Sequence, residues 1–474
     1  MDITEFRKHA HDMVDWMSDY LSDIESYPVK SQVNPGEIIS SLPTHAPENP
    51  ESMEDIMADV KKTIMPGITH WQSPNFYAYF PANSSYPSIL GEMLTATLGV
   101  QGMIWDTSPA ATELEEVIMN WLKDMMGLPK DFYGVIQDTA STASLVAILT
   151  ARERISEYQI NAIGYFTNKY RIYCSTEAHS SIEKAVKIAG FGKEALVKIE
   201  VDNELKMSPG KLEEALKGDI MDGLIPCCVI SAVGTTGTVA IDPIDLIGDI
   251  CKRYNVWHHV DAAYAGTAMI LEENRYMIKG IEKADSYVFN PHKWMFTNFD
   301  CSAYFVKDKE ALVKTFEILP EYLKTNADSV VNNYRDWGIQ LGRRFRSLKL
   351  WFVIRSMGVK GIREKIANHI QWAGELSELI KKDAHFKLHE PQNLGCVCFQ
   401  LNEAIGENQE KRNSLAKNLM DSINQSGKLF MSHTKIKGEF TFRFVIGNTY
   451  VTRKHVMDSW TYIASEASKN LKNV

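Results

Sequence analysis

The residue types best suited to chemistry gather around Lys293, which follows an apolar run and an Asn-Pro pair in the stretch SYVFNPHKWMF. Asn-Pro interrupts regular structure, so we expect Lys293 just past a buried strand, where catalytic groups are commonly displayed. Apolar surroundings lower the pKa of a lysine toward the free amine that attacks carbonyl carbon. The stretch predicts imine chemistry at Lys293, although a snorkelling lysine at a strand end explains this stretch alone equally well.

Two other stretches could supply partners for such a lysine. Asp261 ends the apolar run VWHHVD, and a buried carboxylate needs a cationic or N–H partner. Thr139, Ala140 and Ser141 follow another strand-like run, and small residues that open a helix leave N–H groups free for a phosphate. Ordinary helix capping explains that turn as well.

Further polar groups follow predicted strands. His179 comes after RIYCST and Thr236 after IPCCVISAV, although a lone histidine is more often structural and the glycines beside Thr236 fit a tight turn. The adjacent His258 and His259 would face opposite sides of a strand, which argues against a shared metal ion. An anion-ready turn, a carboxylate and an imine-forming lysine together describe a site for pyridoxal 5′-phosphate (PLP).

The elements that would position these groups alternate between strands and helices from residue 132 to residue 306. The predicted strands are RIYCST, ALVKIEV, IPCCVISAV, VWHHVDAA, SYVF and SAYFV, and the predicted helices cover 141–154, 181–189, 208–217 and 244–254. This alternation predicts an α/β fold with a mostly parallel sheet covered by helices. In such sheets, ligands bind at the carboxyl ends of the strands.

The flanking regions differ from this α/β pattern. Helical spacing predicts opening helices at 2–26 and 53–64, and the C-terminal part mixes helices with the strands GCVCFQL and FTFRFVI. We therefore expect an N-terminal helical dimerisation segment (1–84), a large PLP-binding α/β domain (85–360) and a small α+β domain (361–474). The opening helices would bury little alone, so we expect them to pack on another subunit.

Composition narrows the class of protein. The chain has 474 residues, a formal net charge of −9 and a pI near 5.9, which argue against nucleic acid or an anionic membrane as a main partner. The seven cysteines form no CxxC pair, so no metal site is expected. No apolar run approaches a membrane span and the N-terminus lacks a signal-like apolar region, so we expect a reducing cytoplasmic location.

Seven motifs make the chain resemble the group II pyridoxal-dependent decarboxylases, and most closely the aromatic L-amino-acid decarboxylases. In family order they are FYAYFPANSSYP, WDTSPAATELE, GVIQDTASTA, CSTEAHSSIEKA, HVDAAYAG, FNPHKWMFTNFDCSA and LGRRFRSLKLWFVIR. The resemblance implies PLP-dependent fold type I (aspartate-aminotransferase-like) and a homodimer with shared active sites. It also implies release of CO₂ from tryptophan, tyrosine, phenylalanine or a hydroxylated analogue, which leaves the arylethylamine.

The resemblance also implies roles for individual residues. Lys293 would hold PLP covalently, and Asp261 would keep the pyridine nitrogen protonated. His179 would stack on the ring, with Ala263 against the other face and Thr236 beside it. The phosphate would be held by Thr139, Ala140, Ser141 and Asn290, with His292 close to the imine. Tyr322, in the irregular loop from 317 to 333, would be the general acid.

Substrate recognition is predicted for an aromatic segment and four other positions. The candidates are Trp71, Tyr79, Phe80, Pro81, Ala82, Gln101, Met103 and Gly342. Ala82 stands where animal enzymes have threonine, and Gln101 and Met103 stand where larger apolar groups line the ring site. Gly342 matches a position where glycine goes with room for an indole in plant relatives. Asp138 replaces a glycine beside the phosphate turn, where it could cap the helix instead.

Other functions fit parts of the pattern. An aromatic aldehyde synthase is associated with phenylalanine at the loop tyrosine or asparagine at the stacking histidine, so Tyr322 and His179 favour plain decarboxylation. A glutamate decarboxylase would need a cationic pocket, whereas residues 71–80 are aromatic. A fold-type-I aminotransferase would anchor the substrate carboxylate with an arginine, for which Arg443 is a candidate. A non-catalytic scaffold would have no need of Lys293.

Overall fold

The computed structural model describes residues 1–164, 169–318 and 331–471, and these form two compact units. The first unit comprises residues 1–81, 374–389 and 397–474, and the second comprises 82–373 and 390–396. The first unit thus joins the opening helices to most of the C-terminal part of the chain. The domain boundaries expected after residues 84 and 360 remain predictions.

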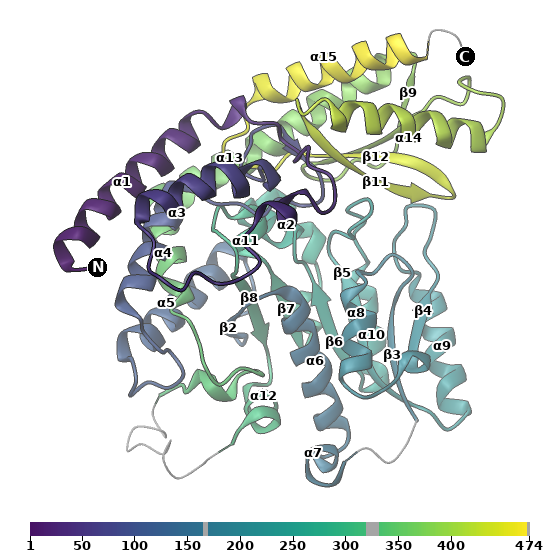
Figure 1. The fold of residues 1–474 in the computed structure, drawn as a ribbon. Coiled ribbons are helices and arrows are strands. Elements are labelled where there is room, and N and C mark those ends of the chain that lie inside the picture. Colours follow the sequence, from purple (N-terminus) through teal and green to yellow (C-terminus); the bar gives the residue numbers. More distant parts are fainter. Residues whose placement is uncertain (165–168, 319–330, 472–474) are drawn as a thin grey trace. The chain divides into compact units, whose positions relative to one another are not determined.

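The second unit is built on a seven-stranded sheet in the order β2-β8-β7-β6-β5-β3-β4 (Figure 1). Its strands are β2 (Tyr133–Gln137), β3 (Tyr170–Ser175), β4 (Leu196–Ile199), β5 (Ile225–Ala232), β6 (Trp257–Asp261), β7 (Ser286–Phe289) and β8 (Ser302–Val306). Only β8 runs antiparallel to its neighbours, and the remaining pairs are parallel. The other six strands therefore end at one edge, which confirms the predicted α/β fold.

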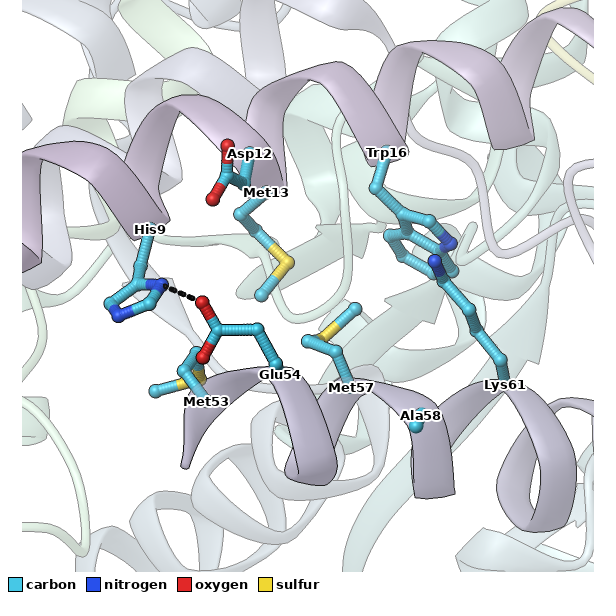
Figure 2. Close-up of a pocket in the computed structure, with 9 residues that line it drawn as sticks. All are labelled: His9, Asp12, Met13, Trp16, Met53, Glu54, Met57, Ala58 and Lys61. Carbon is cyan, nitrogen blue, oxygen red and sulfur yellow. Dashed lines mark ion pairs between the residues drawn. The ribbon is translucent and has the colours of Figure 1, made fainter. Parts of the chain in front are cut away.

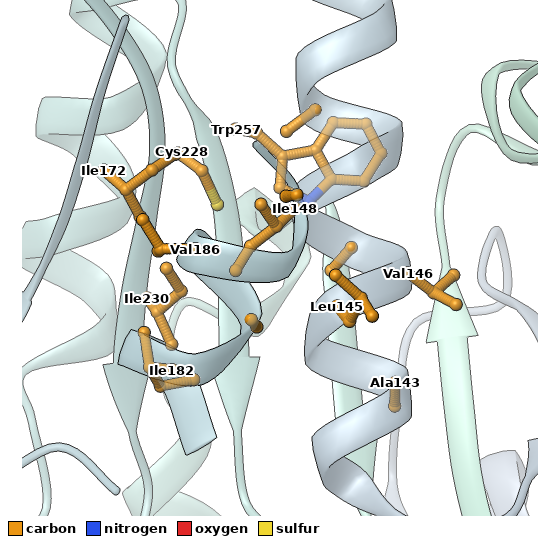
Figure 3. Close-up of a cluster of buried hydrophobic side chains, with 14 of the residues drawn as sticks. Ala143, Leu145, Val146, Ile148, Ile172, Ile182, Val186, Cys228, Ile230 and Trp257 are labelled. Carbon is orange, nitrogen blue, oxygen red and sulfur yellow. The ribbon is translucent and has the colours of Figure 1, made fainter. Parts of the chain in front are cut away.

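Helices cover both faces of this sheet. On one face lie α6 (Ala140–Ile155), α8 (Ser181–Ile188) and α12 (Lys309–Phe316), and on the other lie α9 (Pro209–Met221) and α10 (Ile244–Tyr254). Figure 3 shows the first face, where side chains of α6 and α8 pack on Ile172, Cys228, Ile230 and Trp257 of the strands. Burial of these apolar side chains is the main force that holds α6 on the sheet.

Short local signals set the ends of several elements. The Thr139 side chain caps α6 by accepting from Thr142 N–H, and Asn255 ends α10 with a left-handed φ of 53°. The predicted ranges of α10, β7 and β8 agree with the structure residue for residue. The other helices of this unit are α4 (Tyr86–Leu98), α5 (Pro109–Met126), α7 (Gln159–Ile163), α11 (Pro291–Trp294) and α13 (Arg346–Lys382), which kinks at Gly358 and continues into the first unit.

The first unit contains a five-stranded sheet in the order β1-β11-β12-β10-β9. Its strands are β1 (Phe76–Tyr77), β9 (Phe386–Leu388), β10 (Cys396–Leu401), β11 (Phe430–Ile436) and β12 (Glu439–Val445), and its helices are α1 (Ile3–Ser22), α2 (Glu37–Ser41), α3 (Met53–Asp59), α14 (Gln409–Gln425) and α15 (Arg453–Asn470). β1 pairs with β11, and the Tyr77 ring stacks on Phe444 with 3.8 Å between centroids. The aromatic segment near residue 76 is thus part of the C-terminal sheet.

The opening helices enclose a groove of about 340 Å³ between α1 and α3 with its continuation to Ile64 (Figure 2). Its lining residues are His9, Asp12, Met13, Trp16, Met53, Glu54, Met57, Ala58 and Lys61. Large apolar side chains of α1, including Ile3 (78% exposed) and Phe6 (55% exposed), remain in contact with solvent. No helix within residues 1–164, 169–318 and 331–471 has the length and apolar character needed to cross a membrane.

Candidate active site

The predicted cofactor residues follow strands that end at the same edge of the seven-stranded sheet. Thr139 follows β2, His179 follows β3 and Thr236 follows β5. Asp261 is the last residue of β6, and Lys293 lies four residues after β7. All of these residues belong to the second unit, so one sheet edge brings them together.

Lys293 lies in the short helix α11, whose backbone is firmly held. Its N–H donates to Asn290 O (2.9 Å), and its carbonyl accepts from Asn83 Nδ2 (2.7 Å). The next residue, Trp294, is fully buried, stacks on Tyr264 (4.6 Å between centroids) and approaches His369 Nδ1 to 2.9 Å with its indole N–H. Lys293 itself is only half-buried, which is less than its apolar neighbours in the sequence led us to expect.

His292 is buried beside Lys293 and has a defined tautomer. Its Nδ1 accepts from Cys301 N–H at 2.9 Å, so the proton of the neutral ring lies on Nε2. Burial, with a smaller effect of the Lys293 charge, lowers the pKa of His292 to about 3. At neutral pH the ring is therefore an uncharged donor through Nε2.

Asp261 remains accessible although it ends a buried strand. Its Oδ1 accepts from Ala263 N–H (3.0 Å), and the carboxylate is only half-buried. Behind it, a Cβ added to Gly266 would lie 2.4 Å from Phe289 Cβ, so only glycine allows this close approach to β7. The small residues after Asp261 thus serve packing as well as leaving space in front of the carboxylate.

His179 lies four residues after the end of β3, and the pKa of its ring responds to the charges of Lys293 and Asp261 although the residue as a whole is exposed. Loss of hydration lowers its pKa, the positive charge of Lys293 lowers it further, and the negative charge of Asp261 raises it. Its Nδ1 accepts from the backbone N–H of Ser181 (3.2 Å) and lies 2.7 Å from the Ser181 hydroxyl. This orientation leaves the proton of the neutral ring on Nε2.

The turn between β2 and α6 has the donors that an anion requires. Within the described residues, the N–H groups of Ala140 and Ser141 have no hydrogen-bond partner, as expected for the first turn of a helix. Thr139 N–H donates to Asp138 Oδ1 (2.5 Å), so Asp138 caps the backbone locally. Asn290 is linked to the same turn, because Ser302 Oγ lies 2.6 Å from Asn290 Oδ1 and 3.3 Å from Asp138 O.

The donor set fits the chemistry of PLP. Free N–H groups and hydroxyls at a helix N-terminus match a phosphate, a carboxylate matches a cationic ring nitrogen, and a primary amine matches a carbonyl carbon. Thr236 is exposed in the turn after β5, and Ala263 is half-buried beside Asp261, so neither blocks this edge. The fit rests on the identity of these groups and on the sheet edge that they share.

Four of the predicted substrate residues lie in the first unit. The Trp71 ring stacks on Phe76 (4.4 Å) and Tyr79 (5.8 Å). Tyr79 is 52% exposed, whereas Phe80 and Pro81 are buried. The Arg443 guanidinium lies 5.2 Å from the Phe80 ring centroid, and its Nη1 donates to Ser432 Oγ (2.9 Å). Arg443, the candidate carboxylate anchor of an aminotransferase, therefore already has contacts within its own unit.

The other four substrate candidates lie in the second unit. Ala82 and Met103 are half-buried, whereas Gln101 and Gly342 are exposed and adjacent to one another. A Cβ added to Gly342 would lie 3.1 Å from Gln101 Nε2, and Gln101 Oε1 accepts from Arg343 N–H (2.5 Å). Tyr322, the predicted general acid, lies outside the described residues.

Sequence reasoning missed several residues that hold this edge together. Asn83, Ser302 and His369 contact the Lys293 segment, and the buried pair Glu115–Arg343 (2.7 Å) lies beneath the anion turn. Glu115 could have been noticed as a charge among apolar residues of a helix. The others have no local signal, because their partners are distant in sequence.

The comparisons with known proteins identify the family. The pyridoxal-dependent decarboxylase conserved domain matches residues 35–402. Tyrosine decarboxylase 2 of Narcissus pseudonarcissus is 42% identical and covers 99% of this chain and 95% of its own length. Phenylacetaldehyde synthase of Arabidopsis thaliana is 43% identical, with coverage of 99% and 97%. The crystal structure of Oryza sativa TDC with PLP and tryptamine has a TM-score of 0.96, 33% identity and coverage of 99% of both chains.

The fold is therefore that of PLP-dependent enzymes of fold type I. The chain belongs to the pyridoxal-dependent decarboxylase family, so it is a carboxy-lyase with PLP as its cofactor.

Proposed function

We propose that this enzyme decarboxylates aromatic L-amino acids, such as tyrosine, tryptophan, phenylalanine or their hydroxylated analogues, to arylethylamines and CO₂. The observation that carries the proposal is the grouping of Lys293, Asp261 and His179 at one sheet edge in a chain of this family. The substrate class is supported by relatives named for tyrosine and by a structural neighbour that holds tryptamine.

In the proposed mechanism, bound PLP supplies an electron sink for the pair left when the Cα–carboxylate bond breaks. The Lys293 amine would hold the cofactor covalently, and the Asp261 carboxylate would keep a proton on the pyridine nitrogen. By the resemblance, His179 would pack against the ring of the cofactor, and Ala263 and Thr236 would contact it as well. The N–H groups of Ala140 and Ser141, with Thr139 and Asn290, would bind the phosphate.

Proton return to the substrate Cα completes the reaction. We assign this step to Tyr322 by its resemblance to the family's loop tyrosine, and we assign His292 Nε2–H as a donor beside Lys293. Tyr322→Phe should keep PLP binding while diverting product from amine to aldehyde. Unchanged amine output from this variant would remove Tyr322 from the acid role.

An aromatic aldehyde synthase is the second candidate, because phenylacetaldehyde synthase is as similar to this chain as tyrosine decarboxylase is. His179 and Tyr322 favour decarboxylation. The test incubates the holoenzyme with tyrosine, tryptophan, phenylalanine, DOPA and glutamate, and it measures CO₂, amine, aldehyde and hydrogen peroxide. Amine with matching CO₂ supports decarboxylation, aldehyde with peroxide supports the synthase, and turnover of glutamate alone contradicts both.

We further propose that the enzyme is a homodimer with shared active sites. Helix α4 exposes Tyr86 (57%), Leu90 (56%) and Leu98 (53%) along one side, and such an apolar surface needs a partner. Light scattering should give twice the 53.7 kDa chain mass, and Leu90→Asp with Leu98→Asp should reduce it. Met221→Asp, at an exposed position outside α4 (81%), is the control. A monomer with full activity would contradict the dimer.

We also propose a reducing, cytoplasmic location. All seven cysteines are buried and free, which is usual for proteins kept under reducing conditions. Fractionation of cells that produce the enzyme, with activity and PLP measured in each fraction, tests this location. Activity confined to a membrane or secreted fraction would contradict it.

A further inference from the structure

A buried polar network crosses the core beneath the cofactor edge and is centred on His259 of β6. His259 is fully buried, and both of its ring nitrogens have partners. Nε2 lies 3.3 Å from Ser144 Oγ of α6, and Nδ1 lies 2.9 Å from Ser286 Oγ of β7. Ser286 Oγ also accepts from the indole N–H of Trp257 at 2.9 Å. One imidazole therefore joins three elements of the second unit.

Each of these elements carries part of the cofactor site. Ser144 lies one helical turn after Ala140, at the N-terminal end of α6 that forms the anion turn. Asp261 follows His259 by two residues in the same strand, so their side chains point to the same face. Ser286 begins β7, which leads to the Lys293 segment. The network thus lies directly behind the anion turn, the carboxylate and the lysine.

The chemistry of the network argues for a role in orientation. Burial lowers the pKa of His259 to about 3, so the ring is neutral and has one donor and one acceptor nitrogen. Two serine hydroxyls satisfy these nitrogens in only a few arrangements. An aliphatic side chain would fill the same volume without the cost of burying polar groups. A hydrogen-bonded imidazole is therefore a means to fix direction and spacing more than to add stability.

We propose that His259 is a positioning residue that sets the spacing between the anion turn of α6 and the carboxylate of Asp261. PLP would be bound at both its phosphate and its ring nitrogen, so this spacing would determine cofactor affinity. The proposal rests on the cofactor site described under the proposed function, but not on the identity of the amino-acid substrate.

The neighbouring His258 provides a matched control. It is fully buried in the same strand, and burial lowers its pKa to about 3 as well. In the parallel register His258 pairs with Val229 and His259 with Ile230, and these partners pack in the clusters on opposite faces of the sheet. Its Nε2 contacts Ser231 Oγ (2.7 Å) in the adjacent strand β5, and its register partner Val229 packs on the face of the sheet that α9 and α10 cover.

The test measures PLP affinity in the full-length chain with cofactor removed, by titration followed through the absorbance band that Lys293→Ala abolishes. His259→Leu should raise the dissociation constant for PLP at least about tenfold, whereas His258→Leu should change it less than about threefold. The midpoint temperature of unfolding without PLP is the second readout, and it should change by similar amounts in both variants, because each replaces one buried ring by leucine. Equal PLP affinities in the two variants would overturn the proposal.

A second pair of variants keeps the test decisive where the leucine variants fail to fold. Ser144→Ala removes one hydroxyl from the His259 network, and Ser231→Ala removes one from His258. The first should raise the PLP dissociation constant about threefold and the second should leave it unchanged. Equal affinities in the two serine variants would again overturn the role of His259. Formation of aldehyde in place of amine would change the proposed function without altering either affinity comparison.

Discussion

The residues proposed to bind the cofactor and those proposed to recognise the substrate differ in how the protein holds them. The first group follows strands of one sheet, with backbone bonds such as Lys293 N–H to Asn290 O and a buried network behind them. The second group lies mainly in irregular segments of both units, and Tyr79, Gln101 and Gly342 are exposed. In the proposed site, the groups assigned to the reaction are held at strand ends, whereas several of the groups assigned to recognition are exposed, where side-chain volume would set specificity.

The largest expected effect is at the lysine of the cofactor edge. Lys293→Ala should lower the rate of amine formation by at least about 10³-fold, because it removes the amine proposed to hold PLP covalently. The absorbance band of bound PLP should also disappear in this variant. Lys184→Ala is the control and should retain most of the activity. Lys184 is an exposed lysine of α8 that acts on His179 only through its charge. Retained turnover in Lys293→Ala would remove the central group from the proposed site.

The second prediction concerns Arg343, which contacts both the strand before the anion turn and Gln101, one of the residues proposed to recognise the substrate. Its guanidinium donates to Glu115 and to Ile136 O, just before the anion turn, and its backbone N–H holds Gln101. Arg343→Met should destabilise the fold by about 3–5 kcal/mol, because it leaves the buried Glu115 carboxylate unpaired.

Chemical denaturation of the Arg343 variant measures this loss. The adjacent Arg344 has a half-exposed side chain and pairs with Glu92, so Arg344→Met should cost no more than about 1 kcal/mol. Similar losses of unfolding free energy in Arg343→Met and Arg344→Met would mean that burial does not increase the contribution of the Glu115–Arg343 pair to stability. A loss of PLP affinity in Arg343→Met would show that the Glu115–Arg343 pair also helps to position the anion turn.

The third prediction is a pH dependence that originates in the core around the cofactor edge. Burial lowers the pKa of four histidines to about 3: His258, His259, His292 and His369. The unfolded chain binds these protons below about pH 6.5, and the folded chain does not until about pH 3. Their contribution to stability is therefore present above about pH 6.5 and declines as the pH falls, by about 1.4 kcal/mol per histidine per pH unit.

Denaturant unfolding between pH 7 and pH 5 tests this slope. His369→Phe should flatten it by about one histidine's share, since the ring at this position then has no proton to bind. An identical slope for wild type and His369→Phe would contradict a neutral, buried His369.

The fold could be predicted from sequence where local pattern and burial coincide. β7 and α10 were predicted residue for residue because an apolar run or an amphipathic stripe ends at a clear breaker. Helix α4 was missed because Pro87 and Gly91 obscure its pattern. Glycine is required at position 91, because an added Cβ would lie 2.7 Å from Lys349 Cα. β11 was missed because its exposed face is polar.

The candidate site could be predicted only as a set of residue types. The sequence indicated a lysine, a carboxylate and an anion turn, but not that His292 Nδ1 accepts from Cys301 N–H. The alternation of His258 and His259 was anticipated, yet their serine partners lie 27 or more residues away in the chain. Such long-range pairs follow from the sheet order, which has no local periodicity.

The smallest expected effect is at the recognition positions, and it tests whether specificity is separable from chemistry. Gly342→Ser places a side chain 3.1 Å from Gln101 Nε2, and Gln101 can retreat only by giving up its bond from Arg343 N–H. We expect kcat/KM for tryptophan to fall about tenfold relative to tyrosine, because the indole needs more room than the phenol. PLP affinity should not change. Adding Gln101→Ala to Gly342→Ser should restore part of the tryptophan activity, and Gln101→Ala alone serves as the control for that cycle. An unchanged preference in all three variants would move recognition to the aromatic segment of the first unit.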